Sequence, residues 1–182
     1  MTTLGGRCAV LCLTILAAGL DSPARGDSVT LTQAVSAELA PAAKLAVPAT
    51  VTLVSSGATF QQFAGTLAIS YRVRTSAAGG GTISLEAVSD FSPAGGPSVA
   101  ANSLVYTCSG GTLGSACSGR QTAVTGTQSP VLALPAATCT GGGGVCSTTD
   151  PNSVQVTFSL DDDSSIGTGT YASQIMFVIS AI

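Results

Sequence analysis

Apolar and polar residues alternate with a period of two along several segments of this 182-residue chain. The clearest case is the segment with Leu67, Ile69, Tyr71 and Val73, whose intervening residues are polar or small. Successive side chains of a strand point to opposite faces, so this alternation predicts a half-buried β-strand. The same pattern recurs in three further segments: residues 29–39, 154–160 and 171–181.

The segment from residue 34 to residue 53 allows two interpretations. Residues 34–46 are rich in alanine, which favours a helix. Pro41 and Pro48 interrupt that helix, and an odd-position apolar pattern resumes after residue 44. The residues of this resumed pattern are Leu45, Val47, Val51 and Leu53. We therefore prefer two strands with a break marked by proline.

The pattern as a whole predicts an all-β protein. About seven to nine short strands are separated by turns rich in Gly, Ser and Pro, and no capped helix is visible. This organisation favours an antiparallel, immunoglobulin-like β-sandwich. The last strand is apolar on both faces, since Met176, Val178 and Ile182 lie opposite its main apolar set. Such a strand is expected either in the centre of a sheet or under a cover.

The N-terminal residues resemble an export signal. Arg7 precedes an apolar run from Cys8 to Leu20, and small residues follow it. The run is too short to span a bilayer, and as a helix it would have no polar face for a soluble domain. We take residues 1–26 as a signal peptide and residues 27–182 as a single β-sandwich domain. The mature protein is expected to be secreted and free of the membrane.

Composition and charge exclude several classes of function. Of the nine acidic and six basic residues, Asp21, Arg7 and Arg25 precede residue 27, which leaves eight acidic and four basic residues. This acidic balance disfavours a nucleic-acid partner. The chain has no His, which removes the commonest general base and the commonest metal ligand. We therefore expect no enzyme activity and no cofactor.

Four cysteines remain after the signal peptide: Cys108, Cys117, Cys139 and Cys146. An even number in an exported chain indicates two disulfides. Three pairings are possible, and we favour Cys108 with Cys117 and Cys139 with Cys146, because each pair brackets a turn rich in Gly and Ser. The alternative, a four-cysteine zinc site, lacks the short C-x2-C spacing of such sites.

Three sets of charged residues have a chemical and a structural interpretation. The three acids Asp161–Asp163 could supply oxygen ligands to calcium, but their spacing favours a solvated hairpin turn. Glu86 and Asp90 could act as a glycosidase pair, yet no aromatic platform accompanies them. Arg72 and Arg74 share one face of a predicted strand, where an exposed sheet surface explains them as well as anion binding does. We assign no catalytic or metal site.

The two ends of the chain resemble bacterial fimbrial subunits and secreted proteins of the spore coat U type. The resemblance rests on the opening segment from Val29 to Leu39 and on the terminal segment 169–181, which begins with Gly169-Thr-Tyr171. It implies an immunoglobulin-like subunit whose N-terminal strand completes the sheet of a neighbour. No cysteine between residue 27 and Cys108 could form the early disulfide of many pilins. A cysteine-poor branch and a different secreted sandwich both stay open.

We therefore expect a non-enzymatic structural or adhesive protein of the bacterial cell surface, which polymerises with itself by strand exchange. The residues expected in the exchanging strands are Val29, Leu31, Val35, Leu39, Tyr171, Ile175, Phe177 and Ile179. The main alternative is a monomeric extracellular module that binds carbohydrate or another surface ligand. A third hypothesis is a small hydrolase that uses carboxylates. The aromatic content of 4% argues against sugar binding.

Overall fold

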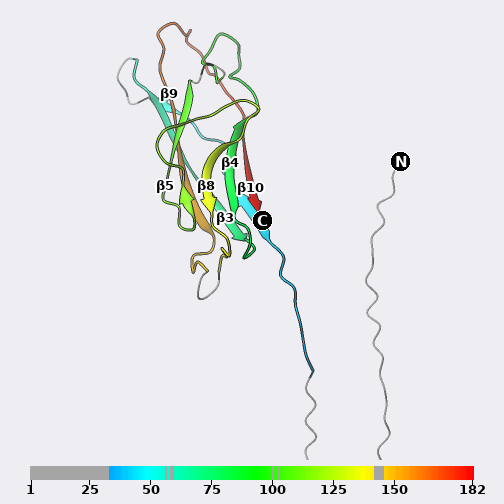
Figure 1. Ribbon diagram of the computed structural model, residues 1–182. Helices are drawn as coiled ribbons and strands as arrows, with labels where there is room; N and C mark the ends of the chain where they lie inside the picture. The colour runs from blue at the N-terminus through cyan, green and yellow to red at the C-terminus, as the bar shows by residue number, and fades with distance from the viewer. Residues whose placement is uncertain (1–32, 56, 58–59, 100, 102, 142–145) are drawn as a thin grey trace, which may run out of the picture. The chain divides into compact units, whose positions relative to one another are not determined.

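A computed structural model describes residues 33–55, 57, 60–99, 101, 103–141 and 146–182 (Figure 1). All of its regular elements are β-strands, which form two antiparallel sheets packed against each other. The all-β class and the sandwich architecture are confirmed. Ten strands occur among the described residues, more than the seven to nine predicted, because three of them have only two residues. The signal peptide prediction lies outside these residues.

The larger sheet has six strands in the order β1-β3-β9-β5-β7, with β2 also paired to β3. Their bounds are β1 Ala42–Ala46, β2 Val54–Ser55, β3 Phe63–Arg74, β5 Leu104–Ser109, β7 Gln121–Thr122 and β9 Asn152–Leu160. The smaller sheet has four strands in the order β10-β4-β8-β6. Their bounds are β4 Gly81–Ala87, β6 Ser115–Ala116, β8 Ser129–Leu134 and β10 Ile175–Ala181.

The core lies between the two sheets and contains the predicted apolar faces. On β3 the exposed fractions of Leu67, Ile69, Tyr71 and Val73 are 7%, 0%, 1% and 4%. The apolar residues of β9 pack beside them in the same sheet, and those of β4 pack against them from the opposite sheet. The alternation along β3 and β9 thus predicted both the strands and their buried faces, because only one face of the larger sheet contacts the core.

The predicted opening strand differs from the structure. Val29 and Leu31 lie outside the described residues, and residues 33–41 belong to no strand. Val35 is 89% exposed and Leu39 is 71% exposed. The first strand is β1, which pairs with the C-terminal half of β3. The strand predicted from the alternation of residues 33–39 is therefore wrong within this chain, since a strand requires a hydrogen-bonding neighbour.

The next predicted strand, from Leu45 to Leu53, is also wrong in its bounds. β1 ends at Ala46, just before Pro48, which has no N–H to donate to a neighbouring strand. Val47, Val51 and Leu53 still pack against the core from an irregular segment. The apolar spacing of these residues indicates contact with the core, but the segment is not a regular strand.

The last strand begins later than predicted and occupies an unexpected position. β10 starts at Ile175, and Tyr171 lies in the preceding segment, where its hydroxyl donates a hydrogen bond to the carbonyl of Gly167 at 2.8 Å. β10 is neither central nor covered by another strand, because it forms the edge of the smaller sheet. The two-faced pattern did not predict this edge position.

Candidate functional site

The two longest free edges of the sandwich lie on the same side. β1 ends the larger sheet and β10 ends the smaller one, and the two strands, cyan and red in Figure 1, lie side by side. At the other end of each sheet are β7 and β6, which have two residues each. Short edge strands offer few backbone groups for pairing, whereas β10 offers an edge of seven residues.

The core is incompletely covered on this side. β10 directs three large apolar side chains toward the core: Ile175, Phe177 and Ile179. All three are only half-buried, whereas their register partners on β4 are 0% exposed. Those partners are Ala87, Leu85 and Ile83. Leu45 of β1 is likewise half-buried beside the fully buried Tyr71 of β3.

We name the region formed by Leu45, Ile175, Phe177 and Ile179 the β1/β10 seam. Within the described part of the chain, no strand pairs with the outer edge of β10. Its outward N–H and C=O groups are therefore free to bond another extended segment. The seam combines this free edge with apolar side chains that would gain burial from such a segment.

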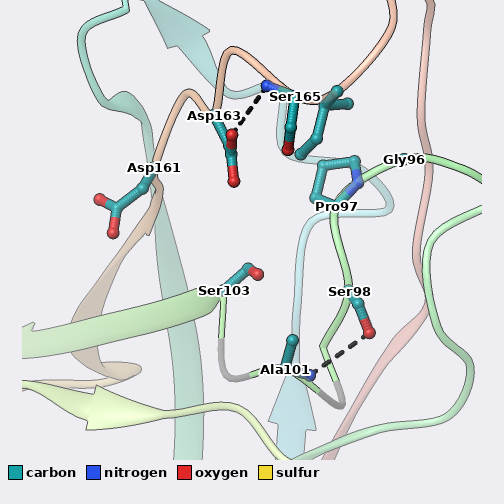
Figure 2. Close-up of a pocket in the computed structure, with 9 residues that line it drawn as sticks. Gly96, Pro97, Ser98, Ala101, Ser103, Asp161, Asp163 and Ser165 are labelled. Carbon is teal, nitrogen blue, oxygen red and sulfur yellow. Dashed lines mark hydrogen bonds between the residues drawn. The ribbon is translucent and has the colours of Figure 1, made fainter.

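A second candidate is a polar pocket at the turn that follows β9 (Figure 2). The cavity has a volume of about 390 Å³ and lies between residues 96–98, 101 and 103 on one side and residues from the turn 161–166 on the other. Asp161, Asp163 and Ser103 line it, together with Ser98 and Ser165. The cavity is wide enough for a small polar ligand.

The two carboxylates of this pocket already have partners within the protein. Asp163 accepts a hydrogen bond from the N–H of Ser165 at 2.8 Å, and this bond holds the pKa of Asp163 below its usual value. Asp161 accepts a hydrogen bond from Gln62 Nε2 at 2.9 Å and lies 3.7 Å from Arg120 Nη2. The described residues contain no group of three potential metal-ligating side chains. The turn is stabilised by these contacts.

Of the two carboxylates considered as a glycosidase pair, Asp90 has hydrogen-bond partners within its own loop. Asp90 accepts hydrogen bonds from Ser98 Oγ at 2.7 Å, from the N–H of Val99 at 2.6 Å and from the N–H of Phe91 at 2.8 Å. These bonds, that of Ser98 first, lower the pKa of Asp90 and fold the loop back on itself. Glu86 lies on β4 opposite Met176 of β10.

Arg72 and Arg74 lie on the same face of β3, as predicted, and each contacts a different segment. Arg72 forms a salt bridge with Asp150. Arg74 Nε donates a hydrogen bond to the carbonyl of Ala40 at 2.8 Å, just before β1. These contacts support the structural interpretation of both side chains over a shared anion site.

The four cysteines of the described residues form two disulfides, Cys108–Cys117 and Cys139–Cys146. This is the local pairing favoured from the sequence. Paired cysteines are typical of proteins that fold in an oxidising compartment.

One polar residue of the core was not identified from the sequence. Asn152 is 0% exposed and lies at the start of β9. Asn152 continues the series of buried positions on β9 that includes Val154 and Val156, but the sequence does not show which segments supply the hydrogen-bond partners of its amide.

Comparisons with known proteins identify no relative. No family model matches the chain, and no curated protein or solved structure matches it. Among the residues that the structure describes, no helix is long and apolar enough to cross a membrane.

Proposed function

We propose that this protein is a secreted, non-enzymatic structural subunit that polymerises by strand exchange. In this proposal the segment from Val29 to Leu39 of one copy pairs with the free edge of β10 in another copy. The proposal rests on one observation above all, the half-buried apolar residues of the β1/β10 seam beside an edge that pairs with no other strand among the described residues.

The chemistry of the opening segment supports this pairing. Val35 and Leu39 are large apolar residues that are 89% and 71% exposed within one copy. They lie four residues apart, so an extended segment directs both to the same face. Phe177 and Ile179 of β10 lie two residues apart, so they also share one face of their strand. A donated segment would bury side chains of both partners and satisfy the outward backbone groups of β10.

The proposed compartment is supported by the disulfides and by the N-terminal sequence. Two disulfides fit export to an oxidising environment. The apolar run from Cys8 to Leu20 has the form of a signal peptide. We infer that export precedes assembly and that the segment after residue 26 becomes available after cleavage.

The test uses the chain from residue 27 to residue 182. Size-exclusion chromatography over a range of concentrations and electron microscopy should show assemblies that grow with concentration. The double variant V35D/L39D should stay monomeric, because two carboxylates would be placed against the apolar seam. The matched control Ser36→Asp adds a charge on the other face of the segment and should assemble like the unmodified chain.

The acceptor is tested with a synthetic peptide of residues 29–39. The peptide should bind the V35D/L39D monomer, whose seam is unoccupied, and should raise its thermal stability. A peptide that carries the same two Asp substitutions should not bind. If the unmodified chain is a monomer at every concentration and forms no filament, the proposal is wrong.

The alternative function is a monomeric extracellular binding module. The polar pocket between residues 96–103 and 161–166 favours it, since serine hydroxyls and carboxylates can bind a polyhydroxylated ligand. A monomer whose stability rises with added saccharides, and whose response is lost in Ser103→Ala, would support this alternative over strand exchange.

A further inference from the structure

The side chain of Asn152 joins both disulfide-closed loops to the core. Its Oδ1 accepts hydrogen bonds from Thr112 Oγ1 at 2.9 Å and from Ser147 Oγ at 3.0 Å. Its Nδ2 donates to Thr140 Oγ1 at 3.1 Å and to the carbonyl of Thr149 at 3.1 Å. All four hydrogen-bonding positions of this fully buried amide are thus occupied.

Two of the four partners of Asn152 belong to the loops that the disulfides close. Thr112 lies in the loop closed by Cys108–Cys117. Thr140 lies in the loop closed by Cys139–Cys146, and Ser147 directly follows that disulfide. A single buried side chain therefore contacts both loops, although they are separate in the sequence.

Both loops also attach to the same end of β3. The hydroxyl of Tyr71 donates a hydrogen bond to the carbonyl of Leu113 in the first loop. The N–H of Val73 donates to Thr140 Oγ1 in the second loop at 3.1 Å. Arg74, at the end of β3, forms a β-bridge with Cys139. The described residues of both loops thus attach to the paired ends of β3 and β9.

We propose that the two disulfides form one cooperative redox unit that is coupled through Asn152, so that reduction of either bond makes reduction of the other easier. Opening one loop removes a partner from the buried amide, and an unsatisfied buried polar group is unfavourable. The amide then holds the other loop less firmly. This inference is independent of the proposed polymerisation.

The redox step is ordinary thiol–disulfide exchange with a dithiol reductant. One thiolate of the dithiol attacks a cysteine sulfur, forms a mixed disulfide and releases the other cysteine as a thiolate, which takes up a proton. The second thiol of the reductant then closes a ring, which releases the first cysteine. Each protein disulfide gains two electrons and two protons, and one dithiol becomes a cyclic disulfide. Complete reduction of the protein consumes two dithiols.

The experiment equilibrates the intact mature chain with mixtures of reduced and oxidised dithiothreitol, alkylates the free thiols and counts them by mass spectrometry. Independent bonds would give a two-thiol species that reaches at least about half of the protein at its maximum. A tenfold coupling between two otherwise equal bonds limits that species to about a quarter. We expect the lower value, with the four-thiol species replacing the oxidised protein almost directly.

Two variants assign the coupling to Asn152. Thr112→Val preserves side-chain size and removes the hydrogen bond from Thr112 Oγ1 to Asn152, together with the bond that Oγ1 accepts from the N–H of Ser153 at 2.9 Å. It should raise the maximum of the two-thiol species toward half. Thr107→Val removes a hydroxyl from the exposed outer face of β5 and should leave that maximum unchanged. Far-ultraviolet circular dichroism at the midpoint should retain the strand signal in all three proteins.

Three results would overturn the proposal. The first is a two-thiol species at half or more of the unmodified chain. The second is a low two-thiol population that Thr112→Val leaves unchanged, which would place the coupling elsewhere. The third is a loss of the strand signal in step with thiol release, because global unfolding would then link the two bonds.

Discussion

Tyr106 should make the protein lose stability in alkaline solution. Its side chain is 0% exposed, and its hydroxyl donates a hydrogen bond to the carbonyl of Pro130 at 2.8 Å. Burial raises the pKa of Tyr106 to about 12 from its ordinary value of 10.0, although a hydrogen bond with Ser129 acts in the opposite direction. The unfolded chain therefore releases this proton at a lower pH than the folded protein does.

The sign and size of the effect follow from this difference in pKa. Below pH 10 the phenol is protonated in both states and does not change the free energy of unfolding with pH. Between about pH 10 and pH 12 the unfolded state binds fewer protons, so stability falls by about 1.4 kcal/mol per pH unit, or about 3 kcal/mol in all. Burial also raises the pKa of Tyr71, which adds a loss of the same sign.

Urea unfolding followed by circular dichroism at about pH 8, 10 and 11 measures this loss. Tyr106→Phe should be less stable than the unmodified protein by about 1–3 kcal/mol at pH 8, because the Pro130 carbonyl loses its donor. Its stability should then fall less steeply above pH 10. Ile69→Val, a buried change of about 1 kcal/mol that leaves the tyrosines intact, should keep the original slope. Equal slopes in Tyr106→Phe and the unmodified protein would refute the reasoning.

Three other predictions concern the glycines, the loop after β4 and the cysteines. Gly65→Ala should destabilise the protein by about 1–3 kcal/mol in thermal unfolding, since a Cβ there would lie 2.6 Å from the carbonyl oxygen of Thr52. Gly167→Ala serves as its control, because a Cβ at residue 167 would lie 3.9 Å from its nearest neighbour, the hydroxyl oxygen of Tyr171. Asp90→Ala should speed amide exchange of residues 91–99. In the unmodified protein the stabilisation by Asp90 should be present above the ordinary Asp pKa and be lost as the pH falls through its lowered pKa. The mature chain should be about four mass units lighter before reduction than after it, and stoichiometric free thiol would contradict both disulfides.

The central strands could be predicted from the sequence because burial differs sharply between their two faces. Val156 and Phe158 of β9 are 0% and 2% exposed, whereas Gln155 between strand neighbours is exposed. A period of two then reads directly as a strand with one buried face. The local disulfides were equally predictable, since each bond joins cysteines less than ten residues apart. Two cysteines that are close in the sequence can easily reach the short distance that a disulfide requires. The partner of a strand is not restricted by sequence distance in the same way.

The polar interior was not predictable by the same means. Asn152 lies on the buried face of β9, and Thr112, 40 positions away in the sequence, shares its amide with the nearer Thr140 and Ser147. The period of two indicates that this position is buried, but it does not indicate which segments satisfy the amide. The same holds for the pocket between residues 96–103 and 161–166, whose walls come from two separate loops.

The errors at the two ends of the chain have a common physical cause. Alternation in sequence indicates that one face of a segment is apolar, but it does not indicate which molecule covers that face. Val35 is 89% exposed, and the core-facing residues of β10 stay half-buried beside fully buried neighbours on β4. Both segments thus carry more apolar surface than one copy of the chain buries. Within the part of the chain that the structure describes, one of these segments has no strand partner and the other has a free edge, and the proposed strand exchange would pair them. A monomer in which residues 33–39 fold onto their own β10 would use the same surface. The dependence of assembly on protein concentration distinguishes the two, because only pairing between copies weakens on dilution.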